Sequence, residues 1–388
     1  TEISTLKPLH LLMASKVLPV ELTQLENLMN PSAISKPSSV KALLAESPAL
    51  TTVPSFYAIN GSSEASEDDQ SGLDLDEYSL PIVDYSMLLN SAAGQRLKII
   101  RDIGNACKDW GFFMVVNHNI PESLVKEMID ACEEFFDLDE SVRSAYAGKG
   151  PEDPVKYGTS FNTSLEKVHY WRDYLKVNVH PQFHSPTRPS GFSELAREYS
   201  RRNREMAREL LRAISESLGL DASYIEKAMN TQEKGFQMMV ANLYPPCPQP
   251  ELAMGMPPHS DHCLLTLLVE NGVGGLQLMH RGKWFNVTPV PGSVLVNTGD
   301  QLEIITNGKY KSVLHRAVLN SKVTRISLGT ANGPALDSVV SPAQELIERE
   351  GDHHPPAYMG MTYKDYISIQ QNNQLNGKSC LDKIRLYS

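Results

Sequence analysis

Two histidines and one aspartate have the residue types and the spacing of a metal site. His259 and Asp261 are separated by one residue, and because residues two apart in a strand face the same side, both can bind one ion. His315 lies farther along the chain in a short segment of alternating polarity, between the same-face residues Val313 and Ala317. Two imidazoles and one carboxylate on one face of an ion leave coordination positions open, an arrangement that suits Fe(II) oxygenase chemistry.

Other interpretations of these residues remain open at this point. A His-x-Asp pair arises easily by chance in a chain of this size, and a lone histidine more often packs in a core than binds a metal. His262 directly follows Asp261 and would face away from it in a strand, so we do not expect it to be a ligand. Cys263 shares the face of His259 and Asp261, but a thiolate favours zinc or copper, and we interpret it as a small residue lining the interior.

Arg325 and Ser327 form a candidate binding site for an anion. They are two residues apart in the segment that follows His315, and residues 320–322 have the composition of a turn. We expect a hairpin in which Ala317 lies opposite Arg325. His315, Arg325 and Ser327 would then point into one interior. A guanidinium beside a hydroxyl can bind a carboxylate through forked N–H bonds and one O–H bond.

The combination of a metal and a buried cation indicates the kind of ligand. A dicarboxylate that chelates the ion at one end and is anchored by Arg325 at the other would fit, and 2-oxoglutarate has that shape. Tyr244, two residues beyond Asn242 in an earlier segment, could add a further donor. The alternative is that Arg325 is a surface arginine on an edge strand and binds no ligand.

The segments that must position these residues are short and apolar. From residue 236 on, about eight runs are separated by turn residues such as Asn307-Gly308, a pattern typical of a closed β-sandwich or jelly roll. They span residues 237–244, 263–270, 275–279, 284–287, 293–297, 302–306, 313–319 and 325–330. Before them, periodicity predicts strands at 80–84 and 112–117 and amphipathic helices at 94–110, 121–136 and 194–218. The expected fold class is α+β.

These patterns divide the chain into four segments. We expect an N-terminal extension and acidic linker at residues 1–78, a helical region at 79–230, the jelly-roll core at 231–340 and a C-terminal helical segment at 341–388. The linker is defined by residues 62–77, which are rich in acidic side chains and too poor in apolar surface to order themselves. Residues 20–29 of the extension are compatible with a helix.

Composition excludes several classes of protein. The chain of 388 residues has a formal net charge of −10 at pH 7, which argues against a nucleic-acid partner or an anionic membrane surface. Its five cysteines are widely spaced without a CxxC pair, as expected of reduced thiols inside a cell. No apolar run has the length of a bilayer span. We therefore expect a cytoplasmic enzyme acting on a small molecule, with no membrane association and no obligate protein partner.

Longer motifs extend these local patterns into a family resemblance. The sequence contains HSD at 259–261, HRAV at 315–318, RIS at 325–327 and NLYPPCPQPEL at 242–252. In this order it resembles the plant 2-oxoglutarate- and Fe(II)-dependent dioxygenase family, in particular its specialised-metabolite branch. The resemblance extends over residues 53–385 and includes LPIVDY at 80–85 and GFFMVVNH at 111–118.

The resemblance implies a fold and a set of site residues. The fold is a double-stranded β-helix, or jelly roll, flanked by N-terminal helices and closed by a C-terminal helix near residues 363–374. The iron ligands would be His259, Asp261 and His315. The residues that hold the far carboxylate of 2-oxoglutarate would be Arg325, Ser327, Tyr244 and Asn242.

The resemblance also implies a reaction. Fe(II) would be the cofactor, with 2-oxoglutarate and O2 as cosubstrates and ascorbate as a stimulant. The expected reaction is hydroxylation, O-demethylation or desaturation of a plant specialised metabolite, with release of succinate and CO2.

Departures from the family pattern bear on the substrate. Many relatives have a phenylalanine where Ala331 stands, so we expect a wider cavity and a bulkier substrate. Some have a basic residue where Val240 stands, so an uncharged substrate is favoured. The expected pocket residues, each of which could equally be a core residue, are Tyr157, Phe161, Trp171, Phe236, Met238, Val240, Ala331 and Asn332.

Two alternatives belong to other functional classes. One is an iron oxidase that does not use 2-oxoglutarate, since such relatives can retain Arg325 and Ser327, and stoichiometric succinate release would separate it from the main hypothesis. The other is a jelly-roll module that binds a ligand without catalysis. Absence of Fe(II) binding, or of 2-oxoglutarate turnover, would favour that module.

Overall fold

A computed structural model describes residues 37–59, 79–148, 150, 153–351, 354–375 and 377–386 of the chain. The helix-compatible residues 20–29 and the acidic linker at 62–77 lie outside the described residues.

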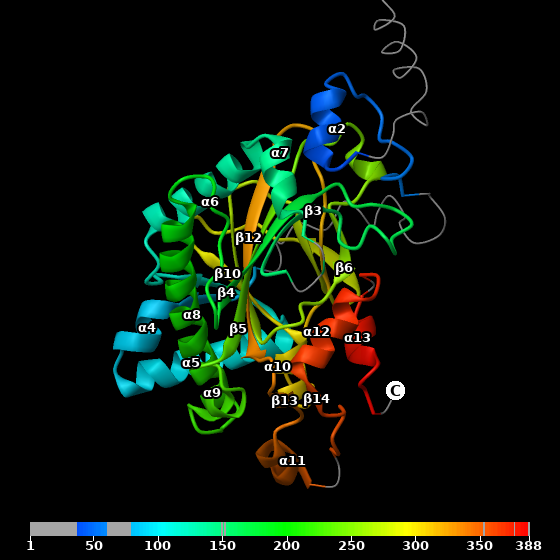
Figure 1. Cartoon of the computed structure of the whole chain (residues 1–388). Helices are drawn as coiled ribbons and strands as arrows, with labels where there is room; N and C mark the ends of the chain where they lie inside the picture. The colour runs from blue at the N-terminus through cyan, green and yellow to red at the C-terminus, as the bar shows by residue number, and fades with distance from the viewer. Residues whose placement is uncertain are drawn as a thin grey trace, which may run out of the picture.

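Two β-sheets form the centre of the described structure (Figure 1). The larger has eight strands among the described residues, in the order β1 (Ile82–Asp84), β2 (Phe112–Val116), β10 (Val294–Thr298), β7 (Leu265–Glu270), β12 (Arg325–Ala335), β5 (Gly235–Tyr244), β4 (Asp173–His180) and β3 (Val155–Thr159). The smaller has the order β6 (Met256–His259), β11 (His315–Ala317), β8 (Leu276–His280) and β9 (Lys283–Asn286). The expected α+β jelly roll is confirmed.

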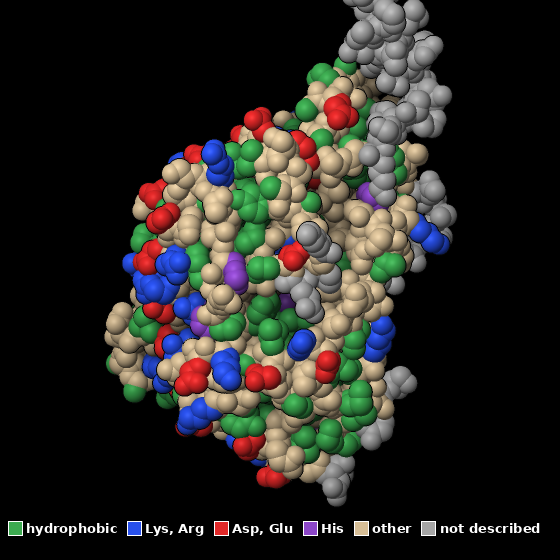
Figure 2. Space-filling view, viewed as in Figure 1, with side chains coloured by type: hydrophobic (Ala, Val, Ile, Leu, Met, Phe, Trp, Pro, Cys, Tyr) green, Lys and Arg blue, Asp and Glu red, His purple; other side chains and the backbone are tan. Residues whose placement is uncertain are grey.

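Three long helices cover one face of the larger sheet (Figure 1). They are α5 (Ala93–Asp109), α6 (Glu122–Asp137) and α8 (Phe192–Ser217), close to the predicted helices. The apolar faces of α6 and α8 pack on β12, where Phe135 and Leu210 share one buried cluster with Leu328, and α5 packs on β1 and β2. Their outer faces carry interleaved basic and acidic side chains (Figure 2), such as the ion pair of Arg201 with Glu198.

The other face of the larger sheet looks into the barrel. On β12, Ile326 and Leu328 belong to the cluster under the helices, whereas Ser327 and Gly329 line an internal cavity. This alternation follows from the two-residue period of a strand. The sheet is therefore buried on both faces, and its polar residues of one parity are gathered in the interior.

Shorter elements complete the described chain. The helices are α2 (Val40–Glu46), α4 (Tyr85–Asn90), α7 (Glu140–Arg143), α9 (Tyr224–Ala228), α10 (Asp300–Ile305), α11 (Gln344–Glu350), α12 (Tyr363–Gln371) and α13 (Ser379–Asp382), with 3-10 turns at Ser144–Tyr146 and Pro250–Leu252. The strands β13 (Val339–Val340) and β14 (Met361–Thr362) pair with each other. Helix α12 begins where the C-terminal helix was predicted. None of the described helices is long and apolar enough to cross a membrane.

One predicted strand is a helix. Residues 302–305 fall in α10, where Leu302 and Ile304 are buried, and Thr306 caps its end. A short apolar run does not distinguish a buried strand from a buried helix by periodicity. Here the backbone N–H of Asp300 donates to the carbonyl of Asp261 at 2.7 Å, so the helix begins against the loop that carries the aspartate. Strands β3 and β4, which the sequence analysis did not predict, extend the larger sheet.

Candidate active site

The strand pairing of the smaller sheet brings the three candidate metal ligands together. His259, the last residue of β6, lies opposite His315, the first residue of β11. The Nε2 atoms of His259 and His315 lie 3.9 and 3.7 Å from Oδ1 of Asp261. One possible ligand atom from each of the three residues lies within 4.8 Å of the others. This is the single group of its kind found among the described residues.

Hydrogen bonds orient both imidazoles for metal binding. The Nδ1 atoms of His259 and His315 lie 2.8 and 3.1 Å from the carbonyl oxygens of Pro257 and Val313. Each Nδ1 must donate to its carbonyl, so in the neutral ring the Nε2 lone pair is directed at the centre of the group. Burial, followed by the nearby His315, lowers the pKa of His259 to about 3, which keeps its ring neutral at physiological pH.

The carboxylate of Asp261 is held charged and fixed in position. Burial alone would raise its pKa, but His315, His259 and the amide of Asn297 lower it to about 2. Asn297 donates its Nδ2–H to Oδ2 of Asp261 at 2.8 Å, which leaves Oδ1 facing the imidazoles. Two neutral imidazoles and a deprotonated carboxylate are the protonation states that metal binding requires. The three residues therefore fit an Fe(II) ion.

Neither neighbouring candidate ligand joins this group. The Nδ1 atom of His262 lies 2.8 Å from the hydroxyl of Tyr363 on α12. The thiol of Cys263 lies 3.1 Å from the hydroxyl of Thr266. Both side chains are engaged elsewhere, and His262 is not a ligand, although it lies in the loop between β6 and β7 and not in the strand that the prediction assumed.

The candidate anion site lies in the larger sheet, and its position corrects one expectation. The hairpin that would place Ala317 opposite Arg325 is absent from the described structure, because β11 and β12 belong to different sheets. Ala317 pairs with Met256 and Leu276, whereas Arg325 pairs with Tyr244. Residues 318–324 join β11 to β12 and cross from one sheet to the other. The two strands therefore lie in different walls of the barrel.

The four residues expected to bind the far carboxylate are adjacent. Arg325 and Ser327 on β12 lie opposite Tyr244 and Asn242 on β5. Asn242 donates its Nδ2–H to the hydroxyl of Ser327 at 3.3 Å, and the guanidinium carbon of Arg325 lies 5.3 Å from the ring centroid of Tyr244.

A buried acid fixes the guanidinium of Arg325. Glu270 on β7 accepts from Nη2 at 2.6 Å and from Nε at 3.2 Å, and the Val273 carbonyl also accepts from Nε. The side chains of Arg325 and Glu270 are 3% and 7% exposed. The sequence analysis missed Glu270, although the alternation of the segment at 263–270 places it on the same face as Leu268 and Thr266, which line the cavity.

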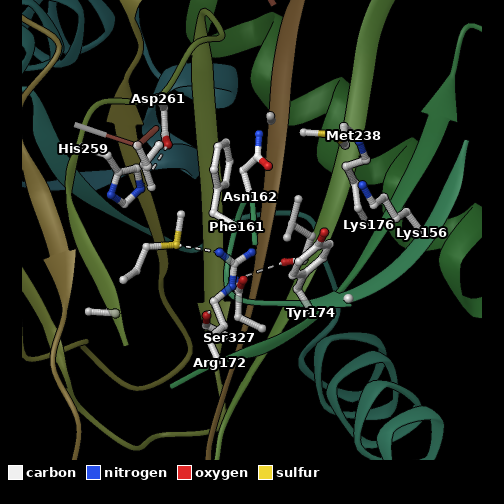
Figure 3. Close-up of a pocket in the computed structure, with 18 of the residues that line it drawn as sticks. Lys156, Phe161, Asn162, Arg172, Tyr174, Lys176, Met238, His259, Asp261 and Ser327 are labelled. Atoms are coloured by element: carbon white, nitrogen blue, oxygen red, sulfur yellow. Dashed lines mark hydrogen bonds and ion pairs between the residues drawn. The ribbon is translucent and has the colours of Figure 1, made fainter. Parts of the chain in front are cut away.

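One cavity of about 640 Å³ joins the metal group and the anion site. His259, Asp261, His315, Arg325 and Ser327 all line it. Figure 3 shows His259 and Asp261 on one side and Tyr174, Lys156 and Lys176 on the other. The cavity is larger than 2-oxoglutarate needs, so it has room for a second organic molecule beside the metal.

Five of the eight expected pocket residues line this cavity: Tyr157, Phe161, Met238, Val240 and Ala331. The other three lie elsewhere. Trp171 is fully buried against Tyr57 at a ring distance of 5.0 Å. Asn332 has the opposite parity to Ala331 and donates to Asn203 under the helices, and Phe236 packs near Tyr363.

Sequence reasoning missed the cavity residues on β3 and β4. Lys156 lies opposite Lys176, and Lys176 lies opposite Val240, so the three form one cross-strand row. Arg172 and Tyr174 also line the cavity. We expected an uncharged substrate only because Val240 is apolar. Lys176 lies beside Val240 and brings a basic group to this part of the cavity, so that reason no longer holds. The alternating residues 173–180 could have indicated a strand, but not which strand it joins.

Comparisons with known proteins agree with this geometry. Residues 235–334 match the profile of the 2OG-Fe(II) oxygenase superfamily, and residues 80–198 match that of the non-haem dioxygenase N-terminal region named for morphine synthesis. The chain is 46% identical to 2-oxoglutarate-dependent dioxygenase 19 of Oryza sativa subsp. japonica, over 79% of this chain and 90% of that protein. The chain belongs to the 2OG-Fe(II) oxygenase superfamily.

A second curated relative and a solved structure match this oxygenase over most of its length. Protein DMR6-LIKE OXYGENASE 2 of Arabidopsis thaliana is 41% identical over 86% of this chain and 94% of its own length. The crystal structure of JOX2 in complex with 2OG, Fe and JA is 30% identical, has a TM-score of 0.79 and covers 92% of this chain and 99% of its own. The protein is therefore a 2-oxoglutarate-dependent dioxygenase with Fe(II) as cofactor, not a module that only binds a ligand.

Proposed function

We propose that this oxygenase oxidises a bulky plant small molecule by hydroxylation, O-demethylation or desaturation, and that it releases succinate and CO2 from 2-oxoglutarate. The observation that carries the proposal is the shared cavity. The metal group and the Arg325–Ser327 pair line one cavity, and about 640 Å³ leaves room for a substrate next to the metal.

Each site residue has a role in this proposal. His259, Asp261 and His315 would hold Fe(II), which when bound supplies the chemistry that activates O2 with 2-oxoglutarate and oxidises a C–H bond. Asn297 keeps Asp261 in place. The remaining donors would bind the far carboxylate of 2-oxoglutarate: Arg325, Ser327, Tyr244 and Asn242.

The shape of the cavity supports a bulky substrate. Gly329 and Ala331 are the smallest residues of the β12 face that lines it, and Thr266 and Leu268 of β7 lie beside them. Met238, the cross-strand neighbour of Ala331 on β5, and Phe161 add apolar surface to the same cavity (Figure 3). Apolar residues that line the cavity keep water away from the reacting carbon. This strengthens the polar contacts around that carbon.

The function is tested with protein loaded anaerobically with Fe(II) and 2-oxoglutarate, then exposed to labelled O2 and a plant extract. We expect one compound to gain labelled oxygen, lose a methyl group as formaldehyde or lose two hydrogens, with one succinate per product. Succinate formed without any matching product would contradict the proposal. Product formed without 2-oxoglutarate would also contradict it and would favour the iron oxidase.

Variants test the anion site separately. Arg325→Met should raise the KM for 2-oxoglutarate at least about tenfold without weakening Fe(II) binding, because a charge-assisted fork is lost. Since this change leaves Glu270 buried without its partner, Ser327→Ala serves as a milder variant with a smaller rise in the same KM. An unchanged KM in both folded variants would show that the far carboxylate binds elsewhere.

A further inference from the structure

A second buried arginine faces the cavity at the start of β4, two strands away from Arg325 in the same sheet. Arg172 lies immediately before β4, is 4% exposed and lines the cavity. Its guanidinium carbon lies 4.8 Å from the ring centroid of Tyr174, and its Nη1–H donates to the sulfur of Met256 at 2.9 Å. Figure 3 shows Arg172 beside Tyr174, reaching toward the side of the cavity that holds His259 and Asp261.

The charge of Arg172 has no acidic partner in the described part of the chain. Its Nε is buried without a hydrogen-bond partner there, and a thioether is a weak acceptor. Arg325, by contrast, has the carboxylate of Glu270 at 2.6 Å. A buried cation without a counter-charge destabilises the folded protein, and a bound anion would remove this destabilisation. Nε and Nη2 form the edge of a guanidinium that binds both oxygens of a carboxylate.

The cavity as a whole is basic, although the chain carries a net charge of −10. Its lining has one acidic side chain, Asp261, and five basic ones, which are Lys156, Arg172, Lys176, Arg316 and Arg325. Bound Fe(II) and the two carboxylates of 2-oxoglutarate cancel each other. Glu270 balances Arg325, but no described acid balances Arg172 in the loaded site, and a cavity lined by one sign of charge favours a ligand of the opposite charge.

We infer that Arg172 binds a carboxylate of the substrate and selects acidic over neutral substrates. Lys176 and Lys156, which follow Arg172 along the β4 and β3 side of the cavity, add to the positive potential around that carboxylate. This inference rests on the proposed function and narrows its substrate class to acids. The molecule would lie with its acidic group at Arg172 and its oxidised carbon toward the metal group.

Binding of matched acid and amide pairs tests the inference. Benzoate, cinnamate and 4-phenylbenzoate are compared with their primary amides, using full-length protein with Fe(II) and saturating 2-oxoglutarate in the absence of O2. We expect at least one acid to bind about tenfold or more tightly than its amide, since the amide cannot form the buried charge contact with Arg172. Arg172→Met should abolish this preference, and Arg172→Lys should retain part of it.

Arg143 offers a matched control. It is also 4% exposed and lies 5.4 Å from the ring centroid of Tyr157, but it does not line the cavity. Arg143→Met should keep the acid preference even where it lowers the melting temperature. Equal binding of acid and amide in all three pairs would overturn the inference, as would a loss of 2-oxoglutarate affinity in Arg172→Met and Arg172→Lys with the acid preference unchanged.

A turnover assay distinguishes failure of the proposed function from failure of the inference about Arg172. If the proposed function fails, no 2-oxoglutarate-dependent oxidation occurs, whatever the binding preference. If only this inference fails, coupled oxidation occurs but the products come equally from neutral and acidic compounds. Arg172→Met would then leave kcat/KM for the identified substrate unchanged.

Discussion

At the scale of single residues, the metal group depends on side chains that do not themselves touch the ion. His259 and His315 are oriented by carbonyls two residues earlier in their own chain segments. Asp261 is different, because its orientation comes from Asn297 on β10, far away in sequence. Such partners fix the direction of a ligand's lone pair and typically contribute 10- to 100-fold to metal affinity.

Asn297→Ala should therefore weaken metal binding about 10- to 100-fold while the fold is retained. Titration calorimetry with Mn(II) in place of Fe(II) measures this directly. Asn271→Ala is the matched control, because Asn271 bonds the backbone of Thr324 and Ile326 in an exposed turn away from the metal group. Equal Mn(II) affinity of Asn297→Ala and wild type would show that Asp261 does not need this support.

At the scale of elements, the start of α10 and the loop after β6 hold each other in place. The N–H groups of Gly299 and Asp300 donate to the carbonyls of Leu264 and Asp261 at 2.9 and 2.7 Å. A Cβ at position 299 would overlap the carbonyl of Cys263. Glycine is thus required by close backbone approach, and the loop that carries Asp261 rests on it.

Gly299→Ala should displace this loop. We expect Mn(II) affinity to fall at least about tenfold, as for other supporting contacts of metal ligands, together with a lower melting temperature. Gly274→Ala is the control, because nothing lies within 4 Å of a Cβ added there. Normal metal affinity in Gly299→Ala would mean that the backbone can adjust without moving Asp261.

Helix α2 is attached to the barrel by a buried acid. The carboxylate of Asp173 on β4 accepts from the N–H groups of Val40 and Lys41 at 2.9 Å each. Val40 and Leu43 then pack on Trp171 in a separate apolar cluster. Burial raises the pKa of Asp173 from 3.8 to about 6, and the two N–H groups oppose the rise only in part.

The pH dependence of stability follows from this shift. Because the folded pKa lies above the unfolded one, the contribution of Asp173 is fully present below about pH 3.8 and is lost as the pH rises through about 6. The difference between pKa values of 3.8 and about 6 corresponds to about 3 kcal/mol.

Urea unfolding of wild type and of Asp173→Asn between pH 4 and pH 7 tests this pH dependence of stability. The advantage of wild type over the variant should shrink by up to about 3 kcal/mol across that interval. The contributions of other buried acids, such as Asp300, are the same in both proteins and cancel in the comparison. A difference that is independent of pH would show that Asp173 keeps an ordinary pKa in the fold.

At the scale of the whole molecule, the catalytic sheet is built from both halves of the chain. Strand β2 pairs with β10, and β4 pairs with β5, so residues before 231 flank the strands that follow. The segment boundaries at 79–230 and 231–340 remain a sequence prediction. The pairing argues that the second segment does not fold without the first, because two sheet edges would be left open.

A fragment of residues 231–386 should therefore aggregate and fail to bind Mn(II), whereas full-length protein binds it. Exposed edges and the uncovered apolar face of β7 and β12 both favour association. Size-exclusion chromatography and calorimetry on the two proteins check this. A monomeric fragment with cooperative unfolding and metal affinity would establish the core as an autonomous unit.

The amino-acid sequence alone was sufficient for the features that depend on near neighbours in the chain. The two-residue period placed Arg325 and Ser327 on a common face, and it grouped His259 with Asp261 although Asp261 lies in the loop just after β6. The longer helices and the jelly-roll class followed from the same kind of periodicity. The strand predicted at 302–306 was wrong, because a short apolar run has no period that separates helix from strand.

Other features came from pairing between distant segments. Nothing near Arg172 or Lys176 in the chain indicates that β4 lies beside β5, so their place in the cavity and the basic charge around Val240 were not predictable. The same holds for Asn297 beside Asp261 and for Glu270 beside Arg325. Local periodicity tells which residues share a face, whereas the choice of which faces meet is made by the long-range packing of the whole chain.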